Sequence, residues 1–242
     1  MGTELSILLV TAASLAFIHT ILGPDHYIPF VMMARARKWS YTKTGWITFA
    51  CGLGHVGSSV ILGIIGISLG LALSNVTSVE GFRGNIAAWV LMGFGLIYFA
   101  WGLRRAIKGK THTHKHLHSN GTAHSHEHKH AGEHAHVHDS TDGKDGKKEI
   151  TPWILFTIFI LGPCEPLIPI LMYPAAKSSW TDVALVAGLF SLVTIATMML
   201  SVGLILYGSK FLPKTNIIER YMHAIAGAII CFCGVSIQFL GL

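Results

Sequence analysis

The sequence predicts an all-α integral membrane protein with six transmembrane helices, arranged as a 3+3 inverted repeat in which the first and fourth helices are broken. Three observations support this class. The 242 residues are only 12% charged and have a mean hydropathy of +0.53, which is typical of membrane proteins. Apolar runs of spanning length recur along the chain. A short motif with an ionisable residue occurs once in each half.

The apolar runs match the roughly 20 residues that a helix needs to cross a bilayer. They lie near 5–34, 45–74, 85–106, 152–174, 181–208 and 218–241. The first run has neither a basic leading segment nor a small-residue cleavage site, so we expect a retained helix and not a signal peptide. The chain then divides into a first repeat over 1–110, a loop over 111–150 and a second repeat over 151–242.

Basic residues predict the orientation. Among the 18 Lys and Arg residues, only Arg83 and Lys177 fall in the second and fourth connections, and the others lie in the first, third and fifth. The positive-inside rule then places the long loop in the cytoplasm and both termini outside. We therefore expect a protein of the plasma (inner) membrane, in contact with lipid and without a nucleic-acid partner.

The first run carries the motif His19-Thr-Ile-Leu-Gly-Pro-Asp-His26. An Asp at the centre of a span costs about 2.5 to 3.5 kcal/mol on insertion, so a function is expected for it. The Gly23-Pro24 pair breaks the helix, because proline lacks an N–H and clashes with the preceding turn. Broken helices beside ionisable groups are the usual construction of a transporter's ion site. For His19, a packed histidine that bonds a carbonyl is the alternative.

The second half repeats this motif. Ile21-Leu-Gly-Pro-Asp-His26 corresponds to Ile160-Leu-Gly-Pro-Cys-Glu165. Because each half has an odd number of spans, the halves insert in opposite directions, and binding groups are expected where they meet. Of the 12 acids, Asp25 and Glu165 are the two expected inside spans. Neutral carboxyls that hold the broken helices together are the alternative.

The second run adds Cys51-Gly-Leu-Gly-His55, with both side chains on one helix face. At 1.5 Å per residue, His55 and Asp25 lie at similar depths of about 14 to 16 Å. His55 is expected to be a ligand, with a packed histidine as the alternative, and Cys51 a small apolar filler. The ligands expected together are His19, Asp25, His26, His55, Cys164 and Glu165. Imidazole among them favours nickel, cobalt or zinc.

Residues 107–150 differ from the rest of the chain. Eleven of the 15 histidines occur there, mostly at every second position among Ser, Gly, Thr, Asp and Lys. Low hydrophobicity predicts disorder. We expect weak, interchangeable metal sites, with a linker whose histidines are incidental as the alternative. These histidines are His112, His114, His116, His118, His124, His126, His128, His130, His134, His136 and His138.

His19-x5-Asp25-His26, Gly54-His55 and Leu161-Gly-Pro-Cys-Glu165 together resemble the NicO-type nickel/cobalt transporter family, including its UreH-like members. The His-rich loop resembles that of the nickel/cobalt efflux members. The resemblance covers both membrane halves and implies a polytopic Ni²⁺/Co²⁺ permease with His19, Asp25 and His26 as ligands. The first motif is one residue longer than the His-x4-Asp-His of nickel permeases, which concerns selectivity more than fold.

We therefore expect a transporter and not an enzyme, with no permanent cofactor and with Ni²⁺, Co²⁺ or else Zn²⁺ as cargo. A cytoplasmic chelating loop favours efflux, and ligands that lose protons on binding metal allow proton coupling. One alternative is a thiol-disulfide electron carrier of the cytochrome c biogenesis type, which Gly162-Pro163-Cys164 resembles. Such a carrier needs a thiol in each half, and Asp25 stands at the position equivalent to Cys164. Another is a metal-sensing membrane protein. Homo-oligomerisation and contact with a metallochaperone stay open.

Overall fold

The computed structural model describes residues 2–108, 112–117, 123–128, 150–177, 179–211 and 215–240. Within these residues, the helices long and apolar enough to cross a membrane are α1 (Thr3–Leu22), α3 (Tyr41–Ser68), α4 (Leu73–Lys108), α7 (Trp180–Gly208) and α8 (Asn216–Leu240). The shorter helices α5 (Thr151–Leu161) and α6 (Leu167–Ala176) occupy the predicted fourth span. The predicted helical class is confirmed, whereas the six-span, 3+3 arrangement stays a prediction.

The first span is interrupted after α1. The chain passes from Leu22 through the 3₁₀ turn η1 (Pro24–His26) into α2 (Ile28–Arg37). Pro24 cannot continue the hydrogen-bond ladder of α1 because it has no N–H. The preceding Gly23 has no room for a side chain, since a Cβ there would lie 2.5 Å from His26 Nδ1. The expected break is therefore present, and a larger residue at position 23 would displace the His26 ring.

The second interruption separates α5 from α6. Gly162 ends α5, and its N–H reaches back to the carbonyls of Ile158 and Phe159 at 3.0 and 3.1 Å. Pro163 then removes the next backbone donor. α6 begins only after Pro166. The break expected at the second motif is therefore also present.

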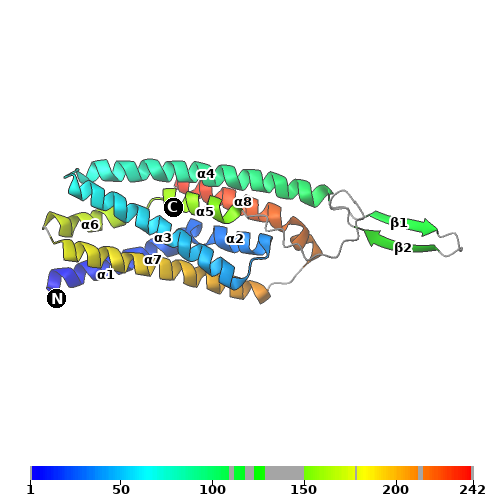
Figure 1. Cartoon of the computed structure of the whole chain (residues 1–242), viewed down its shortest axis with the longest axis horizontal. Helices are drawn as coiled ribbons and strands as arrows, with labels where there is room; N and C mark the ends of the chain where they lie inside the picture. Colours follow the sequence, from blue (N-terminus) through cyan, green and yellow to red (C-terminus); the bar gives the residue numbers. More distant parts are fainter. Residues whose placement is uncertain are drawn as a thin grey trace, which may run out of the picture.

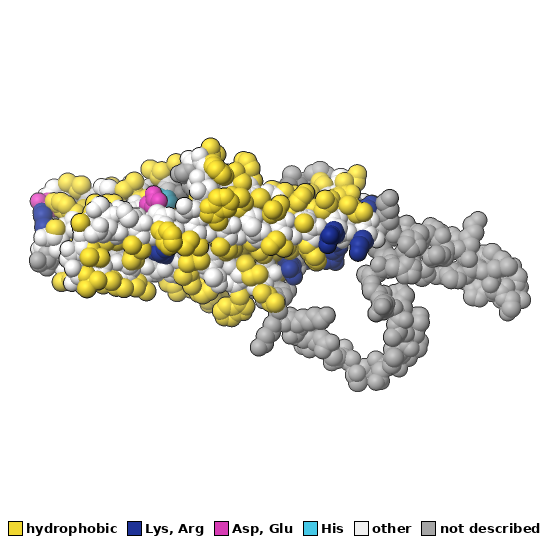
Figure 2. Space-filling view, turned by 90° about the horizontal axis from the view of Figure 1, so that it is seen from above, with side chains coloured by type: hydrophobic (Ala, Val, Ile, Leu, Met, Phe, Trp, Pro, Cys, Tyr) yellow, Lys and Arg dark blue, Asp and Glu magenta, His cyan; other side chains and the backbone are white. Residues whose placement is uncertain are grey.

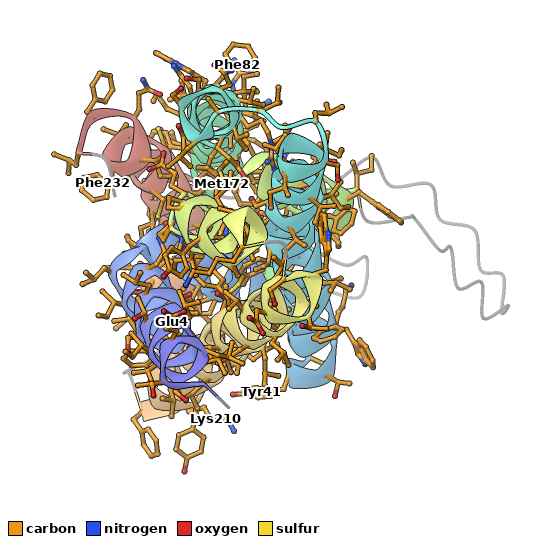
Figure 3. The ribbon with its side chains drawn as sticks, turned by 90° about the vertical axis from the view of Figure 1, so that its left-hand side faces the viewer. Glu4, Tyr41, Phe82, Met172, Lys210 and Phe232 are labelled. Atoms are coloured by element: carbon orange, nitrogen blue, oxygen red, sulfur yellow. The ribbon has the colours of Figure 1, made fainter. Side chains whose placement is uncertain are left out.

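The helices run roughly along the long axis of the molecule (Figure 1). Seen end on, α6 lies in the middle, with α1, α3, α4 and α7 around it (Figure 3). Large apolar side chains point outward, as Figure 3 shows for Phe82 and Phe232, which are 68% and 66% exposed. An apolar outer surface of this kind suits a bundle surrounded by lipid.

The most extensive helix contact in the described part of the chain joins α4 to α8. Gly95 and Gly102 of α4 and Gly227 and Gly234 of α8 all lie in this contact, and a Cβ at any of the four would meet the backbone of the opposite helix. Small residues allow helix backbones to approach closely in membranes. This contact, the glycine seam, joins the first half of the chain to the second.

Basic side chains gather at one end of the bundle. α2, α4 and α7 end there, and α3 and α8 begin there (Figure 1). Figure 2 shows most of the visible Lys and Arg side chains toward this end. Arg105 from α4 lies 3.4 Å from a ring nitrogen of His223 in α8, and Arg37 from α2 lies 5.6 Å from the Tyr98 ring. The side of the membrane that this end faces stays a prediction.

The predicted loop contains a hairpin. β1 (His112–Leu117) pairs antiparallel with β2 (Ala123–His128), with His112 opposite His128. Histidine at every second position matches the period of two of a strand, a pattern that the disorder prediction did not use. His118, His130, His134, His136 and His138 lie outside the described residues. Outside the two strands, the disorder expected for 111–150 stays a prediction.

Candidate metal site

Three histidines converge from three elements. His19 lies in the last turn of α1, His26 ends η1, and His55 lies within α3. One ring nitrogen from each lies within 4.8 Å of the others. The ring centroids are 4.8 Å apart for His19 and His26, and 5.0 Å apart for His26 and His55. The break after α1 keeps the two motif histidines close and turns them toward α3.

Hydrogen bonds at Nδ1 fix two of the rings. His26 Nδ1 lies 3.1 Å from the Gly23 carbonyl and 3.2 Å from Asp25 Oδ1. His55 Nδ1 lies 3.3 Å from the Phe159 carbonyl of α5. These partners accept hydrogen bonds, so each Nδ1 carries the proton and donates it, which leaves a lone pair on Nε2 of the neutral ring. Metal-binding imidazoles are usually held in this way through their other nitrogen.

The Nε2 atoms of His19, His26 and His55 are all buried without a hydrogen-bond partner in the described part of the chain. A buried unsatisfied polar atom costs about 1 to 3 kcal/mol, so three at one place require an explanation. Histidines that simply fill space would be expected to accept a hydrogen bond at these atoms from a nearby donor. A metal ion would accept all three lone pairs. Ligand nitrogens about 2.1 Å from one ion lie about 3.4 Å apart in a tetrahedron, so the rings would close inward on binding.

A cavity of about 350 Å³ reaches this cluster. Its lining comes from both halves of the chain and includes Asp25 of η1, Asn85 of α4, Glu165 between α5 and α6, and Gln238 of α8. Asp25 is 22% exposed. Figure 2 shows acidic and histidine side chains next to each other on the molecular surface. The cavity therefore combines imidazole nitrogens with carboxylate and amide oxygens.

The structure places five of the predicted ligands on this one cavity: His19, Asp25, His26, His55 and Glu165. Cys164 is not part of its lining. It is fully buried in an apolar cluster with Ala12 and Ala16, where a thiol acts as a small apolar side chain. The geometry thus gives no support to Cys164 as a ligand. Cys51 is also buried in an apolar cluster, as expected.

Sequence reasoning missed a buried ion pair near this site. The third span was expected over 85–106, but α4 begins at Leu73, so Glu80 and Arg83 lie inside the helix. Arg83 Nη1 donates to Glu80 Oε2 at 2.8 Å, and Glu80 is 0% exposed. Glu80 is thus a further acid in the helical part of the chain, and unlike Glu165, which is exposed, it is fully buried. The i, i+3 spacing of Glu80 and Arg83 is the sequence signal that could have indicated a helical pair.

Comparison with known proteins identifies no relative, because no protein-family model, no curated protein and no solved structure matches the chain. The resemblance to nickel/cobalt transporters therefore depends on the motifs alone.

Proposed function

We propose that the protein transports a divalent transition-metal ion, Ni²⁺ or Co²⁺ in the first place, and that His19, His26 and His55 bind this ion in transit. The observation that carries the proposal is the convergence of three histidines whose Nε2 atoms are buried without a hydrogen-bond partner among the described residues. Imidazole ligands suit nickel, cobalt, zinc and copper, whereas carboxylate and water ligands suit magnesium, calcium and manganese. Ionisable groups inside membrane helices usually mark an ion path.

Asp25 and Glu165 supply the negative charge that the ion needs. Three neutral imidazoles leave a divalent charge uncompensated, and an isolated charge is strongly unfavourable in a low-dielectric interior. Asp25 hydrogen-bonds to His26 and lines the cavity. Glu165 lines it from the second half. Together the two carboxylates carry the two negative charges that neutralise a divalent cation.

In this proposal the chain consists of two inverted three-helix repeats, with α1–α2 and α5–α6 as the broken first and fourth spans. Both breaks contribute residues to one cavity, and the His55–Phe159 hydrogen bond links the two halves beside it. Movement of the halves opens the site to one side of the membrane and then to the other. The His-rich loop collects metal in the cytoplasm, and transport is outward.

Flux measurements in reconstituted vesicles test this proposal. We expect Ni²⁺ or Co²⁺ flux in the wild type and its loss in His26→Ala, His55→Ala and Asp25→Asn. Cys164→Ser is the matched control, because Cys164 is buried but lies off the cavity. It should keep its flux, whereas an electron carrier would lose activity. Equal flux of Ni²⁺, Co²⁺ and Zn²⁺ in wild-type and protein-free vesicles would reject transport, and varying the pH gradient tests proton coupling.

A further inference from the structure

The Arg83 side chain connects three helices beside the cavity. Besides Glu80 on its own helix, it donates through Nη2 to Ser58 Oγ of α3 at 2.7 Å and to the Ile160 carbonyl of α5 at 2.6 Å. The side chains of Arg83 and Glu80 are 16% and 1% exposed. A buried guanidinium is unfavourable unless its charge and donors are matched. Here the Glu80 carboxylate neutralises the guanidinium, and the contacts with Ser58 and Ile160 lie on the side of the metal site.

The hydrogen bond from Arg83 to α5 is possible because the helix is interrupted between α5 and α6. The last carbonyls of a helix have no donor from within it. In a continuing helix the carbonyls of Phe159 and Ile160 would accept from residues 163 and 164, but Pro163 has no N–H and α5 ends at Leu161. Side chains take the place of those donors: His55 Nδ1 bonds the Phe159 carbonyl, which also accepts from the Gly162 N–H, and Arg83 bonds the Ile160 carbonyl. Arg83 and the metal-binding His55 therefore hold neighbouring carbonyls of the same helix end.

The hydrogen bond from Arg83 to Ser58 of α3 provides a second link between Arg83 and His55. Ser58, which accepts from Arg83, donates its own hydroxyl to the His55 carbonyl at 2.8 Å. The surrounding packing is tight, because a Cβ on Gly54 would lie 2.9 Å from the Ile160 side chain and one on Gly162 would lie 3.1 Å from His55 Nδ1. Arg83 is thus linked to His55 both along α3 and across the end of α5.

We propose that Arg83, neutralised by Glu80, is a positioning residue for the metal site. It holds the end of α5 against α3, so that His55 Nδ1 stays bonded to Phe159 and His55 Nε2 stays directed at the ion. Arg83 does not line the cavity and does not touch the ion. The inference rests on the proposed metal-binding function. Lysine would replace arginine only in part, because a single ammonium does not present the planar fork that reaches Glu80, Ser58 and Ile160 at once.

The test uses Co²⁺ binding to the purified full-length protein, followed by visible absorption, which reports coordination geometry. We expect Arg83→Gln to weaken Co²⁺ binding about 10- to 100-fold, as for other groups that orient metal ligands, and to change the spectrum. Arg83→Lys and Ser58→Ala should show smaller changes in the same direction. Arg104→Gln, an exposed arginine at the far end of α4, is the control and should match the wild type.

Thermal unfolding of each variant separates positioning from folding. If Arg83→Gln does not fold, the milder Arg83→Lys and Ser58→Ala variants decide the question. Suppose that the wild type binds Co²⁺ and His55→Ala does not. Wild-type spectra and affinities in every folded Arg83 and Ser58 variant would then overturn the positioning role of Arg83 but leave the proposed function standing. Absence of Co²⁺ binding by the wild type would instead overturn the proposed function, and this inference with it.

Discussion

At the level of single residues, the important property is that the two ring nitrogens of each histidine have different roles. In His26 and His55 the Nδ1 atoms donate to oxygen acceptors, and the Nε2 atoms are buried without a hydrogen-bond partner in the part of the chain that the structure describes. The same lone pairs that bind a metal also bind a proton, so metal and acid compete for the site. The site therefore needs neutral rings.

This competition predicts a pH dependence of metal binding. Histidine ordinarily titrates near pH 6.5, and protonation of any of the three rings removes a ligand. We expect Co²⁺ affinity to fall as the pH is lowered, with more than one proton taken up for each ion released. Co²⁺ titrations at several pH values measure this dependence. Affinity that does not change with pH would contradict a site made of imidazoles.

At the level of elements, the interruption at Gly23 determines where two of the three ligands point. Gly23→Ala would place a Cβ 2.5 Å from His26 Nδ1 and 2.9 Å from Asp25 Oδ1. We expect this variant to lose metal binding, because His26 has to rotate away from its backing bonds. Gly57→Ala is the control, since a Cβ at Gly57 meets nothing within 4 Å. Co²⁺ binding and thermal unfolding of both variants test the prediction, and equal affinity in the two would contradict it.

The glycine seam gives a second prediction at this level. Gly95→Ala forces a Cβ into the backbone of α8 at Cys231, whereas Gly93→Ala on the same helix meets nothing within 4 Å. Overpacking of a close contact costs about 1 to 3 kcal/mol, so Gly95→Ala should unfold at lower temperature or denaturant concentration. Gly93→Ala should match or slightly exceed the wild type, because alanine favours helix. Similar unfolding of both variants would mean that the seam is loose.

The elements also show which parts of the protein could be predicted from the sequence. Both breaks follow from local Gly-Pro chemistry, which needs no tertiary information. The start of α4 was missed because polar residues ahead of residue 85 lowered the local hydropathy, although buried partners on α3 and α5 accommodate Glu80 and Arg83. Their pairing depends on packing between distant segments, which hydropathy does not describe.

The metal site, too, could be predicted from the sequence only in part. The shared depth of Asp25 and His55 predicted that they meet, and both line one cavity. The rotation of each helix about its axis was not predictable, so sequence reasoning could not place Cys164 in an apolar cluster or connect His55 to the Phe159 carbonyl. Side-chain direction at a broken helix depends on the exact dihedral angles of the break, which residue spacing alone does not define.

At the level of the whole molecule, the bundle and the His-rich loop are separable in the proposal. Among the residues that the structure describes, those that form the three-histidine cluster and line its cavity all lie outside 111–150. Deletion of 112–138 should therefore leave metal flux in vesicles but lower the apparent affinity, since many weak sites near the entrance raise the local metal concentration. Flux at saturating and at low Ni²⁺ tests this. Complete loss at saturating Ni²⁺ would place the loop in the ion path itself.

The glycine seam limits how such a bundle can move. α4 belongs to the first half and α8 to the second, yet their backbones are in direct contact at Gly95, Gly102, Gly227 and Gly234. The two halves therefore cannot separate along this line without losing their closest contact. The cavity lies beside the seam, with Leu91 of α4 and Ile237 of α8 in its wall. In the transport cycle proposed above, the line of glycines would be the hinge axis, with α1, α3 and α7 moving around α4 and α8.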